Sequence, residues 1–237
     1  GNVSPSGKLS GTIARHVNDY PSSSNFGNDL VNLYEEDIYV GYRYFETFNR
    51  KALLYPFGYG LSYSIFEYTS MRSEKKDAEI TIDIKVKNTG EVEGKEVIQV
   101  YCEAPQGKLG KPFVELIGFE KSTCLAKGDS QVLSFNIPMA RLSSYDDGGY
   151  TGYKSAYVLE EGIYNIYIGN NVRDLTLALT FELEQTVILE QLEEALAPIK
   201  DLKRMVPGNR LSSGEYEITY QDVPKRTVDL EKRINDR

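Results

Sequence analysis

Residues 78–87 read AEITIDIKVK, and apolar side chains from Ala78 to Val86 alternate strictly with polar ones from Glu79 to Lys87. This period of two is typical of an antiparallel strand with one face in a core and the other in water. The turn signal Asn88-Thr89-Gly90 follows directly. The stretch therefore predicts a half-buried strand over residues 78–87, with a turn at residues 88–90.

The same pattern recurs toward the C-terminus, between turns marked by Gly, Pro, Asn and Asp. Four more segments are expected to face a core with alternate side chains: Ile98, Val100 and Cys102; Leu133, Phe135 and Ile137; Tyr164, Ile166 and Ile168; Leu175, Leu177, Leu179, Phe181 and Leu183. Strands at this spacing predict a mainly β protein with an immunoglobulin-like β-sandwich of roughly a hundred residues.

The segments on either side have a different texture. Residues 1–64 are rich in Gly, Ser, Asn and Tyr and show no clean period. After the strands, Ile188, Leu192 and Leu196 lie four apart, which predicts a short helix that ends before Pro198. From residue 200 onward the chain is polar and rich in Pro and Gly, so we expect an extended linker or arm there.

Composition excludes several classes of function. The net charge of −8 argues against nucleic acid as a partner, because phosphate contacts require surplus Lys and Arg. No apolar run approaches the ~20 residues that span a bilayer, and the N-terminus has no signal-peptide core, so we expect no membrane partner and a cytoplasmic location. His16 is the only histidine, which leaves no material for a His-based triad or a multi-His metal site.

The two cysteines, Cys102 and Cys124, form no metal or redox motif. Two buried free thiols are the favoured interpretation, and a disulfide between neighbouring strands is the open alternative. No cofactor or metal ligands are expected.

Two acidic clusters are candidates for the paired carboxylates of glycoside hydrolysis: residues 35–37 and residues 146–147. Adjacent residues on a strand point to opposite faces, so neither cluster by itself makes an acid/base pair. Asp146-Asp147-Gly148-Gly149 is typical of a turn, and both clusters are expected in solvated loops. No catalytic residue is predicted.

Aromatic residues crowd into residues 34–68, which hold eight of the 18 tyrosines and four of the nine phenylalanines. Such rings could stack on sugars or bases, yet the chain has no Trp, which a carbohydrate platform would favour. Tyrosines packed between domains, with hydroxyls bonded at the edge, explain the density as well. Packing is the favoured interpretation.

Within this stretch, residues 38–45 (IYVGYRYF) and 55–63 (YPFGYGLSY) resemble glycoside hydrolase family 3, and so do 88–90 (NTG) and 94–101 (GKEVIQVY). The resemblance covers about residues 4–185. It implies three regions: 1–64 as the end of an α/β sandwich domain and its connector, 65–185 as a fibronectin type III-like domain, and 186–237 as a short helix and arm toward an absent catalytic barrel. The arm resembles the permuted β-glucosidases of the family, with residues 226–230 and 232–234 as the approach to the barrel.

The family's nucleophilic Asp and acid/base Glu have no match in this chain. The resemblance thus implies a non-catalytic structural portion of a retaining β-glycosidase, inactive alone. Its partners would be the barrel and sandwich domains, with β-linked gluco-oligosaccharide reached only through them. Arg43 would be an ion-pair or carbonyl-binding partner in an interdomain packing surface that also includes Tyr39, Tyr42, Tyr44, Phe57, Tyr59 and Tyr63. An independent carbohydrate-binding or adhesion module with a fibronectin-like fold is the alternative.

Overall fold

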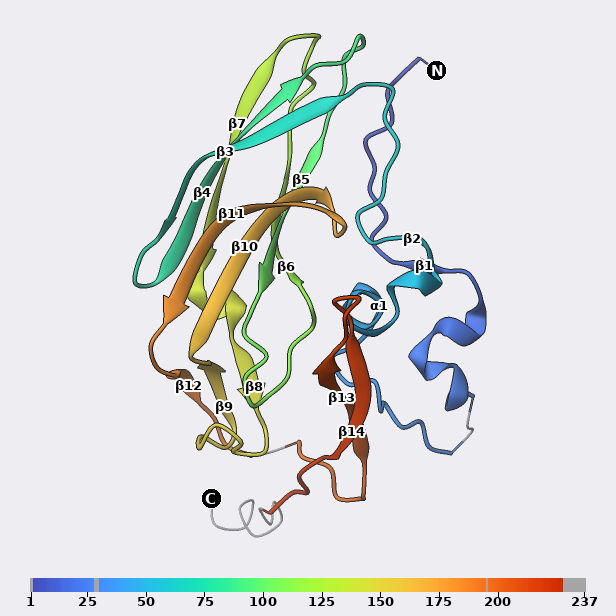
Figure 1. The fold of residues 1–237 in the computed structure, drawn as a ribbon, viewed down its shortest axis with the longest axis vertical. Coiled ribbons are helices and arrows are strands. Elements are labelled where there is room, and N and C mark those ends of the chain that lie inside the picture. Colours follow the sequence, from blue (N-terminus) through green and yellow to red (C-terminus); the bar gives the residue numbers. More distant parts are fainter. Residues whose placement is uncertain (1, 28–29, 195, 228–237) are drawn as a thin grey trace, which may run out of the picture.

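Two antiparallel sheets face each other across an apolar core in the computed structural model, which describes residues 2–27, 30–194 and 196–227 (Figure 1). One sheet has the order β3-β4-β7 and the other the order β11-β10-β5-β6. The strands are β3 (Phe66–Lys75), β4 (Glu79–Asn88), β5 (Val97–Glu103), β6 (Glu115–Lys121), β7 (Ser130–Pro138), β10 (Gly162–Asn171) and β11 (Asp174–Leu183). This arrangement confirms the predicted β-sandwich.

The core is built by the alternation seen in the sequence. Ile80, Ile82, Ile84 and Val86 of β4 are fully buried, and they pack in one cluster with the inward side chains of β5, β7 and β10. Each such side chain stabilises the fold by about 1.5–3 kcal/mol through removal from water. The opposite positions of β4 carry the polar residues that keep this sheet soluble.

The expected strict alternation of β11 is wrong for two residues, because Leu177 is exposed and Leu175 packs against a different cluster, that of Tyr101, Val114 and Val172. Ile166 pairs with Leu179 but Tyr167 pairs with Leu177, so Ala178 is an extra residue in a β-bulge. A bulge shifts the following side chain to the other face. Leu177 is accordingly 54% exposed, whereas Ala178 packs against the core.

The predicted helix after residue 185 is also wrong. Val187–Gln191 forms β12, which pairs with β9 (Ala156–Leu159) and thereby with β8 (Ser144–Asp146) in a third sheet. A spacing of four is an even number, so Ile188 and Leu192 fit the period of a strand as well as that of a helix. The β-branched run Thr186-Val187-Ile188 favours the strand.

Residues before the sandwich form a small layer beside it (Figure 1). The helix α1 (Tyr42–Phe48) lies at its centre, and the short strands β1 (Ile13–Ala14) and β2 (Leu53–Tyr55) pair with each other. Three 3-10 helices belong to this layer, at Val17–Asp19, Pro21–Ser24 and Arg50–Ala52, and a fourth, Met139–Leu142, follows β7. A helix of seven residues is too short to produce a period that sequence analysis can detect.

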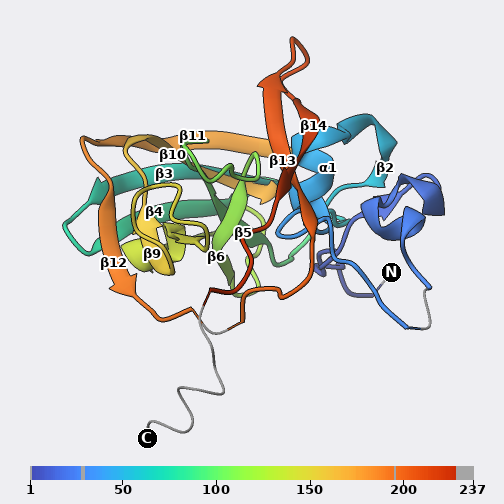
Figure 2. The same ribbon diagram turned by 90° about the horizontal axis from the view of Figure 1, so that it is seen from below.

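The predicted linker after residue 200 is instead a hairpin of β13 (Lys203–Arg210) and β14 (Tyr216–Asp222). The hairpin lies against α1 (Figures 1 and 2), where Met205 is buried in a cluster with Tyr39, Tyr44 and Phe48. A period of two is present in the sequence at 215–220 (EYEITY). Of the predicted approach to a barrel, residues 228–234 lie outside the described residues.

Both cysteines are free thiols, so the disulfide alternative is not realised. Cys102 is buried in the core as predicted, and burial raises the pKa of its thiol. Cys124 is exposed, contrary to the prediction. In the part of the chain that the structure describes, no helix is long and apolar enough to cross a membrane.

Candidate functional site: an aromatic seam and the pocket beside it

The seam is the surface along which residues 42–58 meet β5, β6 and the turn between β10 and β11. Tyr42 lies at its centre, with its ring 4.6 Å from that of Phe57 and 6.3 Å from that of Tyr101. The Tyr42 hydroxyl accepts a hydrogen bond of 2.9 Å from the backbone N–H of Leu116. Aromatic pairs of this kind add about 0.5–1.5 kcal/mol beyond the burial of their surface. Tyr42 therefore fixes α1 to the sandwich through both its ring and its hydroxyl.

Buried polar side chains of α1 form directional contacts across the seam. The Thr47 hydroxyl accepts from the N–H of Phe113 at 2.9 Å. Glu46, 1% exposed, bonds Arg173 at 2.9 Å and Arg50 at 3.0 Å. Burial raises the pKa of the Glu46 carboxyl, and the two arginines oppose this. Hydrogen bonds and ion pairs depend on direction, whereas apolar packing alone would tolerate small rotations. These contacts therefore define one orientation of α1.

A glycine of the aromatic stretch is required where the connector crosses the sandwich. Gly58 has φ +79°, and a Cβ atom on it would lie 2.9 Å from the Cα atom of Asn171. The neighbouring Phe57 carbonyl accepts from the N–H of Val172 at 3.1 Å. Backbone thus lies directly on backbone here, which only glycine permits.

The structure places the seven predicted packing residues in different surroundings. Tyr42 and Phe57 lie in the seam, and Arg43 forms an ion pair of 2.9 Å with Glu115 on β6. Tyr39 and Tyr44 instead pack beneath the β13–β14 hairpin. The ring of Tyr59 contacts that of Tyr55 in a tilted arrangement, and Tyr63 is 62% exposed, outside the seam. Their packing against other domains stays a prediction.

Glu46, Thr47 and Arg173 were not predicted from the sequence as residues of the seam. Glu46 and Arg173 are separated by 127 positions, and nothing local marks them as partners. The one available signal was a carboxylate in the middle of an otherwise aromatic run.

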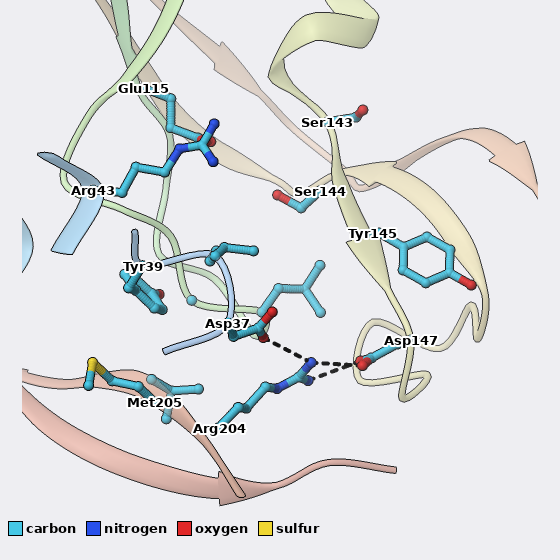
Figure 3. Close-up of a pocket in the computed structure, with 14 residues that line it drawn as sticks. Asp37, Tyr39, Arg43, Glu115, Ser143, Ser144, Tyr145, Asp147, Arg204 and Met205 are labelled. Carbon is cyan, nitrogen blue, oxygen red and sulfur yellow. Dashed lines mark hydrogen bonds and ion pairs between the residues drawn. The ribbon is translucent and has the colours of Figure 1, made fainter. Parts of the chain in front are cut away.

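Beside the seam is a pocket of about 260 Å³ between α1, β8 and β13 (Figure 3). Arg204 crosses its floor and forms a bidentate pair with Asp147 at 2.7 and 2.9 Å, and a longer contact of 3.4 Å with Asp37. The two acidic clusters, expected in separate solvated loops, therefore meet at one arginine. The lining includes Asp37, Tyr39, Arg43, Gly110, Glu115, Ser143, Ser144, Asp147, Arg204 and Met205.

The pocket is suited to hydrogen bonding, and its carboxylates Asp37, Glu115 and Asp147 each face an arginine. Burial raises the pKa of the Asp37 carboxyl, and the Arg204 guanidinium opposes this. Within residues 2–27, 30–194 and 196–227, no set of three or more His, Cys, Asp or Glu side chains could hold a metal ion.

The turn that carries Asp147 is organised by Asp146, which confirms the predicted turn although its side chain is fully buried. Its carboxylate accepts from the N–H groups of Gly149, Tyr150 and Thr151 at 2.7–2.9 Å, and from the Thr151 hydroxyl at 2.6 Å. Burial alone would raise the pKa of this carboxyl, but the hydrogen bonds outweigh burial and lower it.

Asp146→Asn is expected to destabilise the chain by about 1–3 kcal/mol at pH 7, since Asn offers one acceptor oxygen in place of two charged ones. Because the folded-state pKa of Asp146 is depressed, its stabilisation is present above pH 3.8 and is lost as pH falls through the folded-state pKa. The difference between wild type and variant should shrink with acidification. Urea unfolding at neutral and acidic pH measures it, with exposed Asp77→Asn as control. A difference independent of pH would contradict the prediction.

The chain is similar to a known domain family and to several β-glucosidases. A model of the fibronectin type III-like domain matches residues 96–172. A β-glucosidase of Ruminococcus albus is 48% identical over 97% of this chain, and β-glucosidase A of Butyrivibrio fibrisolvens is 42% identical over 96%. The crystal structure of a β-glucosidase from Paenibacillus barengoltzii matches the whole chain with a TM-score of 0.98 and 49% identity. The chain spans 23%, 29% and 27% of these three proteins, respectively.

Proposed function

Since the chain belongs to glycoside hydrolase family 3, as the region around its fibronectin type III-like domain, we propose that it is a non-catalytic structural portion of a β-glucosidase-like enzyme. Its role is to hold the catalytic domains at a fixed separation and angle. The seam carries this proposal, because buried hydrogen bonds and ion pairs give α1 one orientation on the sandwich.

The layer that contains α1 also offers a surface for another domain. Ile13 and Tyr55, which pair directly across β1 and β2, are 43% and 40% exposed. Apolar side chains gathered on a two-stranded sheet are typical of a face that another element covers. We propose that the rest of an α/β sandwich domain packs there. The seam would then fix the orientation of that domain relative to the fibronectin type III-like domain.

Rigid support has a catalytic consequence. The active site of such an enzyme would depend on groups from more than one domain, and a displacement of about 1 Å can reduce a rate about 100-fold. In this proposal β-linked gluco-oligosaccharides bind to the catalytic domains and not to this chain.

A chimera tests the proposal. This chain would replace the matching 27% of the Paenibacillus barengoltzii enzyme, whose fold it shares with a TM-score of 0.98. We expect the chimera to hydrolyse an aryl β-glucoside and the isolated chain to release no product. Turnover by the isolated chain, after removal of any copurifying enzyme, would contradict a non-catalytic role.

Seam variants of the same chimera test the bracing role itself. Glu46→Ala and Thr47→Val together should lower kcat about tenfold while the chimera stays folded, because α1 loses the contacts that orient it. Asp77→Asn, on the exposed turn between β3 and β4, is the control and should leave kcat unchanged. Unchanged kcat in the folded seam variant would argue against bracing.

A further inference from the structure

The pocket between α1, β8 and β13 contains a binding group with no partner in the described chain. Tyr39 is 2% exposed, and its hydroxyl has no hydrogen-bond partner among the described residues. Leaving a buried hydroxyl without a hydrogen-bond partner destabilises the folded chain. A ligand that hydrogen-bonds to this hydroxyl would remove the unfavourable free energy of the unpaired group, which favours binding. We propose that this pocket binds a small neutral polyhydroxylated molecule, either a monosaccharide or a linear polyol.

A glycine lies beside the hydroxyl. Gly110 has φ +67°, and a Cβ atom built on it would lie 3.4 Å from the Tyr39 oxygen and 2.9 Å from Pro207. Any larger residue would both strain the backbone and crowd the hydroxyl. Figure 3 shows Tyr39, Asp37 and Ser144 arranged around the same hollow.

The charges of the pocket select a neutral ligand. Asp37, Glu115 and Asp147 are matched against Arg43 and Arg204, which leaves a formal charge of only −1. An anion would meet three carboxylates, and a cation would meet two arginines. Sugar hydroxyls donate to carboxylates and accept from N–H and O–H groups, so they suit a lining of both kinds.

The size of the pocket limits the ligand. Its volume of about 260 Å³ is just below the ~300–1,000 Å³ of pockets that hold drug-sized ligands. One sugar ring or a short polyol fits such a volume, and an oligosaccharide does not. Burial raises the pKa of the Tyr39 hydroxyl, so it stays protonated and can donate.

The lining residues that the structure describes all belong to this chain, so binding can be measured separately from the proposed bracing role. Isothermal titration calorimetry of the chain with glucose, sorbitol and glycerol tests it. We expect saturable binding of at least one of them, and the preferred compound distinguishes a ring sugar from a linear polyol. Absence of saturable binding by all three would overturn the proposal.

Tyr39→Phe removes only the hydroxyl and should weaken binding about 5–10-fold. Without ligand the variant should melt at a temperature no lower than wild type, because the lost hydroxyl has no partner. Tyr44→Phe is the matched control, since Tyr44 packs in the same aromatic cluster but does not line the pocket. Equal affinities of Tyr39→Phe and wild type, or equal losses in the two variants, would assign the binding to another place and overturn the site.

Discussion

Asn88→Ala is expected to lower the free energy of unfolding by about 3–5 kcal/mol, a large share of the stability of an ordinary domain. The Asn88 side chain is fully buried and makes four hydrogen bonds. Its amide group donates to the carbonyls of Val92 and Leu125 at 2.8 Å, and its oxygen accepts from Ser64 and Gly90 at 2.6 and 2.9 Å. Alanine removes all four bonds and leaves a small cavity, while the Gly90 N–H keeps a bond of 3.2 Å to the Ile65 carbonyl and the Leu125 carbonyl keeps one of 3.1 Å from the Gly94 N–H.

This residue also links the two parts of the chain, because Ser64 belongs to the connector and Leu125 to the loop before β7. Urea unfolding followed by circular dichroism measures the loss. Asn136→Ala is the matched control, since Asn136 lies on the exposed face of β7, and it should change stability by no more than about 0.5 kcal/mol. A loss below about 1 kcal/mol for Asn88→Ala would show that water replaces the missing bonds.

Lys111→Met is expected to cost about 3–5 kcal/mol, because it removes one member of a buried ion pair. Lys111 and Glu160 are each 3% exposed and pair with each other. The Glu160 carboxylate also accepts from the backbone N–H of Lys108 at 2.6 Å, which holds the loop between β5 and β6. With methionine at position 111, the carboxylate is left charged and buried without its cation.

The double variant Lys111→Met with Glu160→Gln separates the charge from the hydrogen bonds. The amide oxygen that Glu160→Gln introduces can still accept from Lys108, and no charge remains buried. We therefore expect the double variant to be more stable than the single one by about 1–3 kcal/mol. Lys127→Met is the control, since Lys127 pairs with Glu91 at 2.6 Å in an exposed position and should contribute at most about 1 kcal/mol. A double variant no more stable than Lys111→Met would mean that the lysine contributes through packing rather than charge.

The sandwich was predictable from sequence because its determinants are local. Alternation in residues 78–87 sets which face of β4 is buried, and a slip of one residue would expose four aliphatic side chains. The turn at Asn88 and the core positions of β5, β7 and β10 follow from the same rule. Where a strand departed from it, at Ala178, the bulge depended on pairing with β10 and not on the sequence of β11 itself.

The hairpin at the end of the described chain illustrates an intermediate case. Its alternation at residues 215–220 was legible, but Pro207, Gly208 and Gly214 favoured a linker. Burial of Met205 against Tyr39 and Tyr44 supplies the stabilisation that a two-stranded hairpin lacks by itself.

By itself the sequence determined the β-sandwich, its family resemblance and the crowding of aromatic residues before it. Tertiary structure alone decided which of those residues form the seam, and that Glu46 meets Arg173 and Arg204 meets Asp37 across 127 and 167 positions. The pocket likewise exists only once α1, β8 and β13 are brought together. The reason is physical: a strand's pattern reports which face meets water, whereas the pairing of polar groups distant in sequence depends on where the folded backbone places them.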